Sequence, residues 1–386
     1  MCISTIFVTA LKRKSFQHTA ILVNNEPAER MKTMTKWMIY GANGYTGELI
    51  ARQAVHDGMT PVLAGRNREA ITKLAEELGF ESRVFSLDDP DTVVENLKDM
   101  ELVLHCAGPF SKTSRQMVEG CLTAGTHYLD ITGEIGVFEM IHDVGMSKRA
   151  SDKGIVLCPG VGFDVIPTDC TAHKLKELMP NATELALGFS FLAGMSPGTT
   201  KTMVEGLSGG SAQRKDGRIV PFPMGSKKRT LDFGKGQETA TAIPWGDVST
   251  AYYTTKIPNI TTWIPLSERQ IRGARAMSLF APVLGTKPVQ KQLLKWVDRS
   301  VKGPDERARE NAPSYIVGEA KAADGRTITV RLKTTNAYTL TALGSLEVVR
   351  RMLGRDLPSG SFTPAGLFGS GLVESLEGSG EFEVVE

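Results

Sequence analysis

A short apolar strand that runs straight into a glycine-rich turn constrains this chain most. The strand is Lys36–Tyr40, and the turn reads Gly-Ala-Asn-Gly-Tyr-Thr-Gly. Gly41 permits a sharp strand-to-helix turn, Gly44 lets backbone N–H groups approach a pyrophosphate, and Gly47 lets the next helix pack on the strand. The alternative is a purely structural turn, because this spacing also occurs in proteins that bind no nucleotide. The predicted cofactor contacts are Gly41, Asn43, Gly44, Tyr45, Thr46 and Gly47.

The stretch from residue 34 to about 166 alternates apolar strands with helical patterns, which predicts βαβ units and a parallel sheet. Ligands of such sheets bind beyond the carboxyl ends of the strands. The predicted fold is α/β, a Rossmann-type doubly wound parallel sheet with a second mixed α/β domain. The predicted strands are Trp37–Tyr40, Pro61–Ala64, Arg83–Ser86, Leu102–Cys106, His127–Asp130 and Ile155–Cys158.

The second strand is followed by Gly-Arg-Asn-Arg, where an NAD-specific protein usually carries an acidic residue for the ribose hydroxyl. A guanidinium at Arg66 instead suits a 2′-phosphate through charge-assisted hydrogen bonds. We therefore predict NADP, with NAD as the alternative, and we take Arg66 and Asn67 as cofactor contacts. The structural alternative is that Arg66 and Arg68 are solvated charges at the start of a helix over Glu69–Leu78.

Two further strand ends carry residues that suit a cofactor. Asp88 could accept a hydrogen bond from an adenine amino group, or it could cap a helix that starts near Pro90, and both interpretations stay open. After the fourth strand, Ala107, Gly108 and Pro109 offer small side chains and a stiff turn beside the nicotinamide half. This second group predicts a packing surface without chemistry of its own.

The fifth and sixth strands end next to carboxylates, at Asp130, Glu134 and Asp164. A carboxylate held in a partly dry cleft can have its pKa raised and then donate a proton. The alternative for Asp130 and Asp164 is that they cap helices or tie loops. His127 and Tyr128 lie inside the fifth strand, and a general-acid role for either is a hypothesis. The catalytic candidates are Asp130, Glu134, Asp164 and Tyr128.

Five motifs together resemble the saccharopine dehydrogenase-like oxidoreductase family, including its trans-acting enoyl reductase branch. The resemblance implies an NAD(P)-binding Rossmann domain followed by a mixed α/β domain that dimerises and covers the active cleft. It carries over the glycine turn and Arg66 as cofactor residues. The second half shows no recognisable arginine set for an amino-dicarboxylate, so the resemblance implies no substrate. The motifs are Tyr40–Gly47, Leu63–Arg66, His105–Phe110, His127–Glu134 and Gly160–Asp169.

The second half predicts longer strands in a mixed sheet with helices on one face. An Asp-Gly pair at 324–325 predicts a hairpin between two of them. Phe163, Lys201 and Trp245 are candidate substrate contacts; the threonine-rich loop Ser196–Thr202, which enters a predicted helix Met203–Leu207, can equally serve structure alone. The predicted strands are Thr183–Phe191, Ile219–Pro223, Arg229–Phe233, Ala240–Ile243, Ile260–Ile264, Tyr315–Ala320 and Thr327–Leu332.

The segment Arg269–Lys302 predicts two helices broken between Gly285 and Pro288. It holds eight Lys or Arg residues against the single acid Asp298. Its apolar residues recur at helical spacing, which is typical of a basic amphipathic helix at a membrane surface or over a lipid-like substrate. The alternative is a packed helix with a solvated face.

The 386 residues suffice for two domains. We expect an N-terminal extension over 1–33, disordered or an organelle-targeting peptide, unless translation starts at Met31 or Met34. The expected domains are a Rossmann domain over 34–166 and a substrate and dimerisation domain over 167–338. Residues 339–386 are expected to form a helix and a tail that returns to the first domain.

Composition excludes several classes of function. A net charge of +2 does not suggest a nucleic-acid partner, and no apolar run reaches the roughly 18 residues of a membrane span. The cysteines show no paired spacing and no neighbouring histidine cluster, so we predict reduced cytoplasmic cysteines and no metal site. They are Cys2, Cys106, Cys121, Cys158 and Cys170.

These observations favour an NADP-dependent reductase, expected as a cytoplasmic homodimer, that moves a hydride onto an activated C=C, C=N or C=O bond of a small or lipid-like substrate. The alternative is a non-catalytic NADP-binding sensor or scaffold, because no Tyr-x-x-x-Lys or Cys–His catalytic pair is evident. A third hypothesis is a reductase of lipid intermediates in peripheral contact with a membrane.

Overall fold

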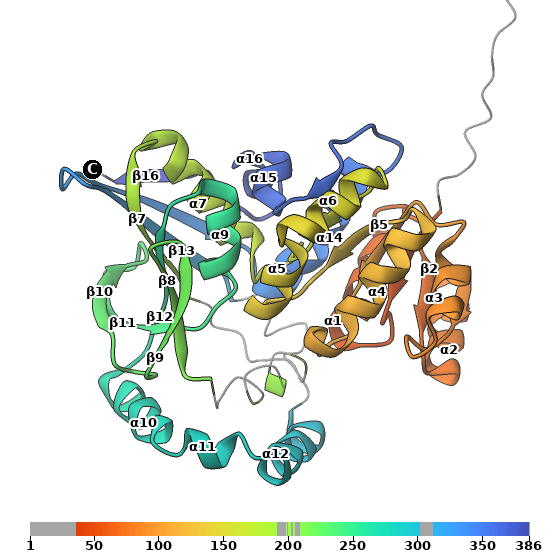
Figure 1. Cartoon of the computed structure of the whole chain (residues 1–386), viewed down its shortest axis with the longest axis horizontal. Coiled ribbons are helices and arrows are strands. Elements are labelled where there is room, and N and C mark those ends of the chain that lie inside the picture. Colours follow the sequence, from red (N-terminus) through yellow and green to blue (C-terminus); the bar gives the residue numbers. More distant parts are fainter. Residues whose placement is uncertain are drawn as a thin grey trace, which may run out of the picture. The chain divides into compact units, whose positions relative to one another are not determined.

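The computed structural model describes residues 36–190, 209–301 and 312–385, together with Gly198, Thr200, Lys201 and Val204. Two β-sheets with their helices make up this part of the chain (Figure 1). The predicted extension over 1–33 lies outside the described residues. So do most of the predicted loop Ser196–Thr202 and of the helix predicted after it.

The first sheet has seven strands in the order β15-β6-β5-β4-β1-β2-β3, and every pair is parallel. This arrangement confirms the predicted Rossmann-type sheet. Its strands are β1 (Trp37–Tyr40), β2 (Val62–Gly65), β3 (Ser82–Val84), β4 (Leu102–His105), β5 (His127–Asp130), β6 (Val156–Cys158) and β15 (Gly360–Ser361). The helices between them are α1 (Tyr45–His56), α2 (Arg68–Leu78), α3 (Pro90–Leu97), α4 (Phe110–Ala124), α5 (Ile135–Ile141) and α6 (Val144–Asp152).

Both faces of this sheet are covered, which explains why its strands read as continuous apolar runs. Trp37 and Ile39 belong to a core that includes apolar residues of α1 and α2. Met38 and Tyr40 point to the opposite core, which α3, α4, α5 and α6 complete. Helix α14 (Ala337–Met352), from far along the chain, packs against α1 and adds to the first core.

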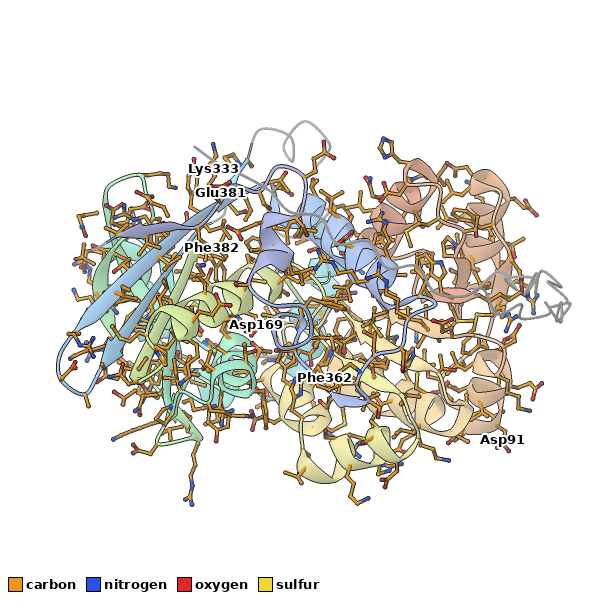
Figure 2. All side chains as sticks on the ribbon, turned by 90° about the horizontal axis from the view of Figure 1, so that it is seen from above. Asp91, Asp169, Lys333, Phe362, Glu381 and Phe382 are labelled. Atoms are coloured by element: carbon orange, nitrogen blue, oxygen red, sulfur yellow. The ribbon has the colours of Figure 1, made fainter. Side chains whose placement is uncertain are left out.

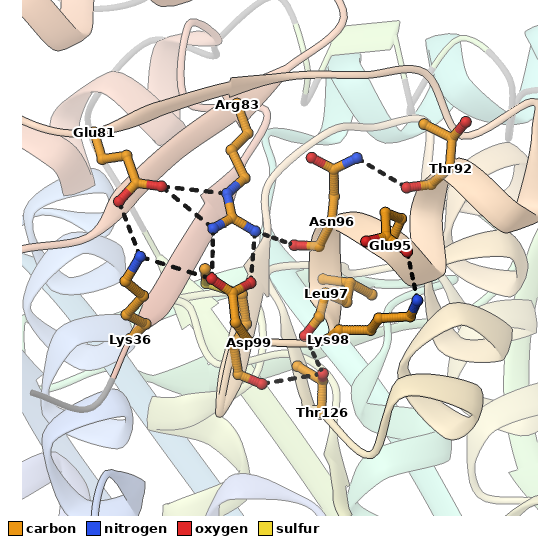
Figure 3. Close-up of polar contacts among 11 residues, drawn as sticks. Lys36, Glu81, Arg83, Thr92, Glu95, Asn96, Leu97, Lys98, Asp99 and Thr126 are labelled. Atoms are coloured by element: carbon orange, nitrogen blue, oxygen red, sulfur yellow. Dashed lines mark hydrogen bonds and ion pairs between the residues drawn. The ribbon is translucent and has the colours of Figure 1, made fainter. Parts of the chain in front are cut away.

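Paired charges hold the amino ends of β1, β3 and β4 (Figure 3). The guanidinium of Arg83 donates to both carboxylate oxygens of Asp99 at 2.7 Å and to the carbonyl of Asn96 at 2.8 Å. Lys36 bridges Glu81 and Asp99 at 3.2 and 3.7 Å. The Arg83 guanidinium lowers the pKa of Asp99 to about 2, so this pair is charged at neutral pH.

The second sheet is mixed and runs β10-β11-β12-β7-β13-β14-β16, with β8 paired to β12 and β9. Strands β7 and β12 are parallel and the other pairs are antiparallel. Helices α7 (Ile166–Leu178) and α9 (Asp247–Thr255) pack on it through a shared apolar core. The strands are β7 (Ala182–Ser190), β8 (Ser211–Lys215), β9 (Arg218–Phe222), β10 (Lys228–Asp232), β11 (Gln237–Ile243), β12 (Asn259–Pro265), β13 (Ser314–Ala322), β14 (Thr327–Thr334) and β16 (Glu383–Val385).

The predicted hairpin is confirmed as β13 and β14, whereas β8 escaped prediction. Its residues Ser-Ala-Gln-Arg-Lys are mostly polar and have low strand propensity, so sequence alone gives no strand signal there. Its antiparallel pairing with β9 supplies what propensity does not.

The C-terminal tail contributes to both sheets. Strand β15 extends the first sheet beside β6, and β16 pairs with β14 of the second. Two short helices lie between them, α15 (Pro364–Phe368) and α16 (Gly371–Glu374). Figure 2 places Phe382 beside Lys333 of β14, whose carbonyl accepts a hydrogen bond from Gly380 N–H at 2.9 Å. The domain limits at residues 166 and 338 stay predictions.

The basic segment forms three helices rather than two. They are α10 (Glu268–Ser278), α11 (Ala281–Leu284) and α12 (Lys287–Ser300). The predicted break after Gly285 is confirmed, and a second break separates α10 from α11. No helix in the described part of the chain has the length and apolar character to span a membrane.

Candidate functional site

Two glycines of the turn after β1 are required by the fold itself. Gly41 has φ +84°, and a Cβ added there would lie 2.8 Å from Ala107 after β4. A Cβ at Gly47 would lie 2.4 Å from the Gly41 carbonyl oxygen, because α1 packs closely on the turn. Either position would clash with backbone if it carried any other residue.

Gly44 is different, because its own surroundings demand glycine far less. Its φ of −78° and ψ of 160° suit any residue, and an added Cβ would meet only the Gly41 oxygen, at 3.3 Å. Gly44 is also the N-cap of α1, and no side chain among the described residues caps this helix. An exposed helix N-terminus kept clear of side chains is the surroundings that a phosphate needs. These residues therefore fit the pyrophosphate of a dinucleotide.

The other predicted turn residues lie around this N-terminus. Asn43 reaches toward the end of β2, where its Oδ1 would be 3.1 Å from a Cβ added at Gly65. Thr46 lies half-buried in the first turn of α1. The Tyr45 ring meets the ring of Tyr338 edge to face, with centroids 5.2 Å apart. Tyr338, from α14, therefore borders the turn, and no sequence signal indicated it.

The charges of Arg66 and Asp88 both act on the same group, the buried phenol of Tyr40 at the end of β1. Burial raises the pKa of Tyr40 to about 12, the charge of Arg66 opposes that rise, and the charge of Asp88 adds to it. Arg66 is exposed and has no ion-pair partner among the described residues. An unpaired guanidinium beside the end of β2 fits a 2′-phosphate.

Two predicted cofactor contacts already have partners in the chain. Asn67 is the N-cap of α2 and accepts a hydrogen bond from Ala70 N–H at 3.2 Å. Asp88 accepts one from the Ser86 hydroxyl at 2.6 Å. The N-cap of α3 is Asp89, so the alternative that Asp88 caps this helix is wrong. Asp88 remains exposed, as an adenine contact requires.

The residues after β4 lie between the turn and the later strands. Ala107 contacts the position where Gly41 would carry a side chain. Gly108 is exposed and is joined to the half-buried Pro109 by a cis peptide bond. Ala107, Gly108 and Pro109 therefore place no large side chain at this part of the sheet edge. The packing surface for a cofactor stays a prediction.

Asp130 and Tyr128 are fully buried and bonded to each other. The Tyr128 hydroxyl donates to Asp130 Oδ2 at 2.6 Å, and the N–H groups of Thr132 and Gly160 donate to Oδ1 at 3.0 and 2.8 Å. Burial raises the pKa of Asp130 to about 6. Neither side chain is exposed to solvent, so neither can touch a substrate. The geometry favours the alternative that Asp130 ties β5 to the loop after β6.

Glu134 also serves the fold. Its two carboxylate oxygens accept hydrogen bonds from Phe110 N–H and Ser111 N–H, both at 2.9 Å. These are N–H groups of the first turn of α4, so Glu134 caps that helix from a neighbouring loop. A catalytic role for Glu134 would require it to release this helix.

Asp164 is the one catalytic candidate whose carboxylate is left without a hydrogen bond from any described residue. It is partly exposed, yet its surroundings are dry enough to raise its pKa to about 7 by burial. Its Oδ2 would be only 2.8 Å from a Cβ added at Gly133, so the carboxylate lies over the residues that follow β5. Because β5 is two strands from β1, this places it about 10 Å along the sheet edge from the glycine turn.

The predicted substrate contacts divide. Trp245 is half-buried, and its Nε1 donates to the carbonyl oxygen of Asp164 at 3.1 Å, which brings it to the same corner. Phe163 is buried in the core, with its ring centroid 5.9 Å from that of Phe189, so it is not a surface for substrate. Lys201 is half-buried, and most of the loop that precedes it lies outside the described residues.

Asp247, two residues after Trp245, was not among the sequence-predicted site residues. It is fully buried, and its Oδ1 accepts a hydrogen bond from the Thr168 hydroxyl at 2.5 Å, whereas Oδ2 has no hydrogen-bond partner in the described part of the chain. Burial, with the charges of Asp169 and Asp164, raises the pKa of Asp247 well above its usual range.

A metal site and a surface pocket are two other candidate sites to compare with these residues. Within the described ranges, no group of three or more His, Cys, Asp or Glu side chains could hold a metal ion. A pocket lined by residues that include His142, Tyr253, Lys256 and Ser361 contains none of the candidates above. The candidate site is therefore the carboxyl edge of the first sheet, from the glycine turn to Asp164.

Comparison with known proteins agrees with this geometry. Residues 37–156 match the model of the saccharopine dehydrogenase NADP binding domain. A saccharopine dehydrogenase-like oxidoreductase of Rattus norvegicus is 27% identical over 220 residues, covering 49% of this chain and 51% of that protein. A trans-acting enoyl reductase of Mycobacterium bovis is 29% identical over 226 residues, covering 55% and 52%. The chain spans about half the length of these curated relatives.

The fold likeness extends further along the chain. The apo saccharopine dehydrogenase (L-Glu forming) of Saccharomyces cerevisiae superposes with a TM-score of 0.59 at 10% identity, covering 91% of this chain and all of that one. This likeness confirms the predicted α/β class with a second mixed sheet, and it concerns the fold alone. Residues 37–156 are therefore similar to the NADP binding domain of the saccharopine dehydrogenase family, which agrees with the resemblance noted in the sequence.

Proposed function

We propose that this chain is an NADP-dependent oxidoreductase that transfers a hydride between nicotinamide and an activated C=C, C=N or C=O bond. The observation that carries the proposal is Asp164, a partly exposed carboxylate with a pKa near 7 and no hydrogen-bond partner among the described residues. It lies on the same sheet edge as the glycine turn. A proton donor with a pKa near the working pH is the group that such a reduction requires.

The first half of the edge binds and orients the cofactor. Backbone N–H groups at the start of α1, beside Gly44, would hold the pyrophosphate, and the Arg66 guanidinium would pair with the 2′-phosphate. The bound cofactor supplies the hydride. The small residues Ala107–Pro109 leave room for the nicotinamide half of the cofactor to extend toward Asp164.

The second half of the edge supplies the proton. Asp164 in its protonated form donates to the atom of the substrate that becomes negative as the hydride arrives. Trp245 holds the backbone of Asp164 through its indole N–H, which anchors the residue that carries the carboxyl group. A half-buried indole ring beside the donor also offers an apolar surface to a small or lipid-like substrate.

The names of the relatives support this class of reaction and favour one kind of reduced bond. One group is named oxidoreductase and the other enoyl reductase, which favours a C=C bond conjugated to a carbonyl. The homodimer and the cytoplasmic location stay predictions, as does NADP over NAD at the level of Arg66.

The experiment measures binding first and turnover second. Calorimetry with NADPH and NADH establishes the cofactor, and absorbance at the NADPH band then follows oxidation in the presence of enones, imines and carbonyl compounds. We expect NADPH to bind more tightly than NADH and at least one enone to be reduced. Failure to bind either nucleotide contradicts the proposal. Tight binding with no turnover across the panel favours the non-catalytic sensor instead.

A further inference from the structure

The three helices α10, α11 and α12 gather large apolar side chains at the surface. They follow one another along one edge of the described structure (Figure 1). Each of the two longer helices is anchored inward by one buried residue, Ile271 in α10 and Val297 in α12. Five of the ten large apolar side chains exposed in the described part lie here, between 48% and 79% exposed: Met277, Leu279, Phe280, Val283 and Trp296.

The same helices carry cations that have no carboxylate partner in the described part of the chain. None of seven Lys and Arg side chains on them has a carboxylate partner among the described residues. The exposed acid Glu268 at the start of α10 is already paired with Lys228, at 2.9 Å. The seven are Arg269, Arg272, Arg275, Lys287, Lys291, Lys295 and Arg299.

Apolar and basic side chains share one face on α12. Trp296 and Arg299 are three residues apart, so they lie on the same side of the helix, and Lys295 borders them. An indole flanked by cations is the arrangement found where helices lie at the boundary between lipid headgroups and acyl chains. A packed helix with an ordinary solvated face would not expose the tryptophan.

A second copy of this chain is a poorer occupant. Symmetric pairing of this face would bring the seven cations of each copy together with only two acids per copy, Glu268 and Asp298, to balance them. A surface of anionic lipids supplies both missing partners, negative charge for the cations and an apolar layer for the exposed side chains.

We infer that α10, α11 and α12 form a docking surface for an anionic lipid bilayer, on which the protein lies without crossing it. This inference is independent of the hydride chemistry, because none of its residues belongs to the sheet edge that holds the candidate site. It explains why apolar and unpaired basic residues coincide on one face.

The test is sedimentation of the full chain with vesicles of phosphatidylcholine alone and with vesicles in which about one lipid in three is phosphatidylserine. We expect at least about tenfold stronger partitioning into the anionic vesicles, and a loss of most of this binding when salt rises from about 0.1 to 0.5 M. Equal partitioning into both kinds of vesicle, or none, overturns the inference.

Two variants separate the two contributions. Lys287→Glu, Lys291→Glu and Lys295→Glu together remove the attraction, and Leu279→Ser, Phe280→Ser and Trp296→Ser together remove the insertion. We expect each triple variant to lower partitioning into anionic vesicles at least about tenfold. These side chains are exposed, so circular dichroism and the thermal unfolding midpoint should not change.

Matched controls change the same chemistry elsewhere. Lys73→Glu, Lys153→Glu and Lys321→Glu reverse three other exposed lysines, and Val144→Ser removes the most exposed apolar side chain outside the segment. We expect both controls to bind like the unaltered chain. Loss of binding in the lysine control to the same degree would reduce the effect to net charge and overturn the docking surface. So would a wild-type dimer that the Leu279, Phe280 and Trp296 changes convert to monomer.

Discussion

The two ends of the first sheet differ in whether their charged side chains have partners. At the amino ends of its strands, Lys36, Glu81, Arg83 and Asp99 are paired with one another (Figure 3). At the carboxyl ends, Arg66 has no ion-pair partner and the Asp164 carboxylate has no hydrogen bond within the described residues. The charged side chains at the amino ends form ion pairs that stabilise the fold. The charged side chains without such partners lie at the carboxyl ends, where a parallel sheet binds its ligand.

The carboxyl end itself contains both kinds of group. Asp130 and Glu134 are hydrogen bonded to backbone N–H groups and hold loops together. Asp164 comes from the same class of strand end but has no such partner. The position of a carboxylate at a strand end therefore does not make it catalytic, and its hydrogen bonds decide between the two roles.

The largest expected effect is on turnover at Asp164. With an acceptor identified from the panel above, Asp164→Asn should lower kcat by about 10² to 10⁴-fold, because the proton donor is lost. The Kd for NADPH should not change. The matched control Asp152→Asn alters an exposed acid of α6 and should keep full activity. A variant at Asp164 that retains most of its turnover would remove this residue from the mechanism.

The pH profile sharpens the same point. The folded pKa of Asp164 is raised to about 7, so the proton-donating form is present below that pH and is lost as the pH rises through it. We expect kcat to fall above about pH 7 in the unaltered chain. The residual activity of Asp164→Asn should show no such step in that range. A step that persists in the variant would assign the titration to another group.

Gly44→Val should act on binding rather than on stability. The backbone there suits valine, but its side chain would fill the space over the start of α1. We expect the Kd for NADPH to rise at least about 100-fold, equivalent to about 2.7 kcal/mol. Gly136→Ala in α5, where an added Cβ meets nothing within 4 Å, is the control and should bind normally. Unchanged affinity in Gly44→Val would place the pyrophosphate elsewhere.

Arg66→Gln should affect one cofactor selectively. Loss of a charge-assisted hydrogen bond to the 2′-phosphate should weaken NADPH binding by about 10 to 100-fold, while NADH binding stays the same. Arg68→Gln is the comparison, because Arg68 begins α2 and is equally exposed. If Arg68→Gln has the larger effect, the contact belongs to the second arginine.

The smallest effect is expected at the amino end. Arg83→Met should lower the free energy of unfolding by about 1 kcal/mol at pH 7, since Asp99 is half exposed and its ion pair is partly screened. The folded pKa of Asp99 is lowered to about 2, so its contribution is present above the unfolded pKa of about 3.9 and is lost as pH falls toward 2. Urea unfolding at both pH values measures this.

NADPH affinity of Arg83→Met should equal that of the unaltered chain. If it falls as far as in Arg66→Gln, the distinction between a structural end and a ligand-binding end is wrong.

The first sheet could be predicted from the sequence because the signals for its strands and turns are local. Strand β5 was predicted to the residue, and the turn at Gly41–Gly47 carries its own spacing. The different roles of Asp130 and Asp164 could not be predicted, because the N–H group of Gly160 that donates a hydrogen bond to Asp130 lies 30 residues away in the sequence. Tyr338 was out of reach for the same reason, since α14 meets α1 only in the folded chain.

The most direct test is a crystal structure of the chain with NADPH bound. The account predicts the pyrophosphate at Gly44 on the N-terminus of α1, the 2′-phosphate on Arg66, and the nicotinamide ring beside Asp164 and Trp245. A reducible group placed on that ring would then be within about one water molecule of the Asp164 carboxyl. A nicotinamide ring on the far side of the sheet edge from Asp164, or a 2′-phosphate that does not contact Arg66, would contradict it.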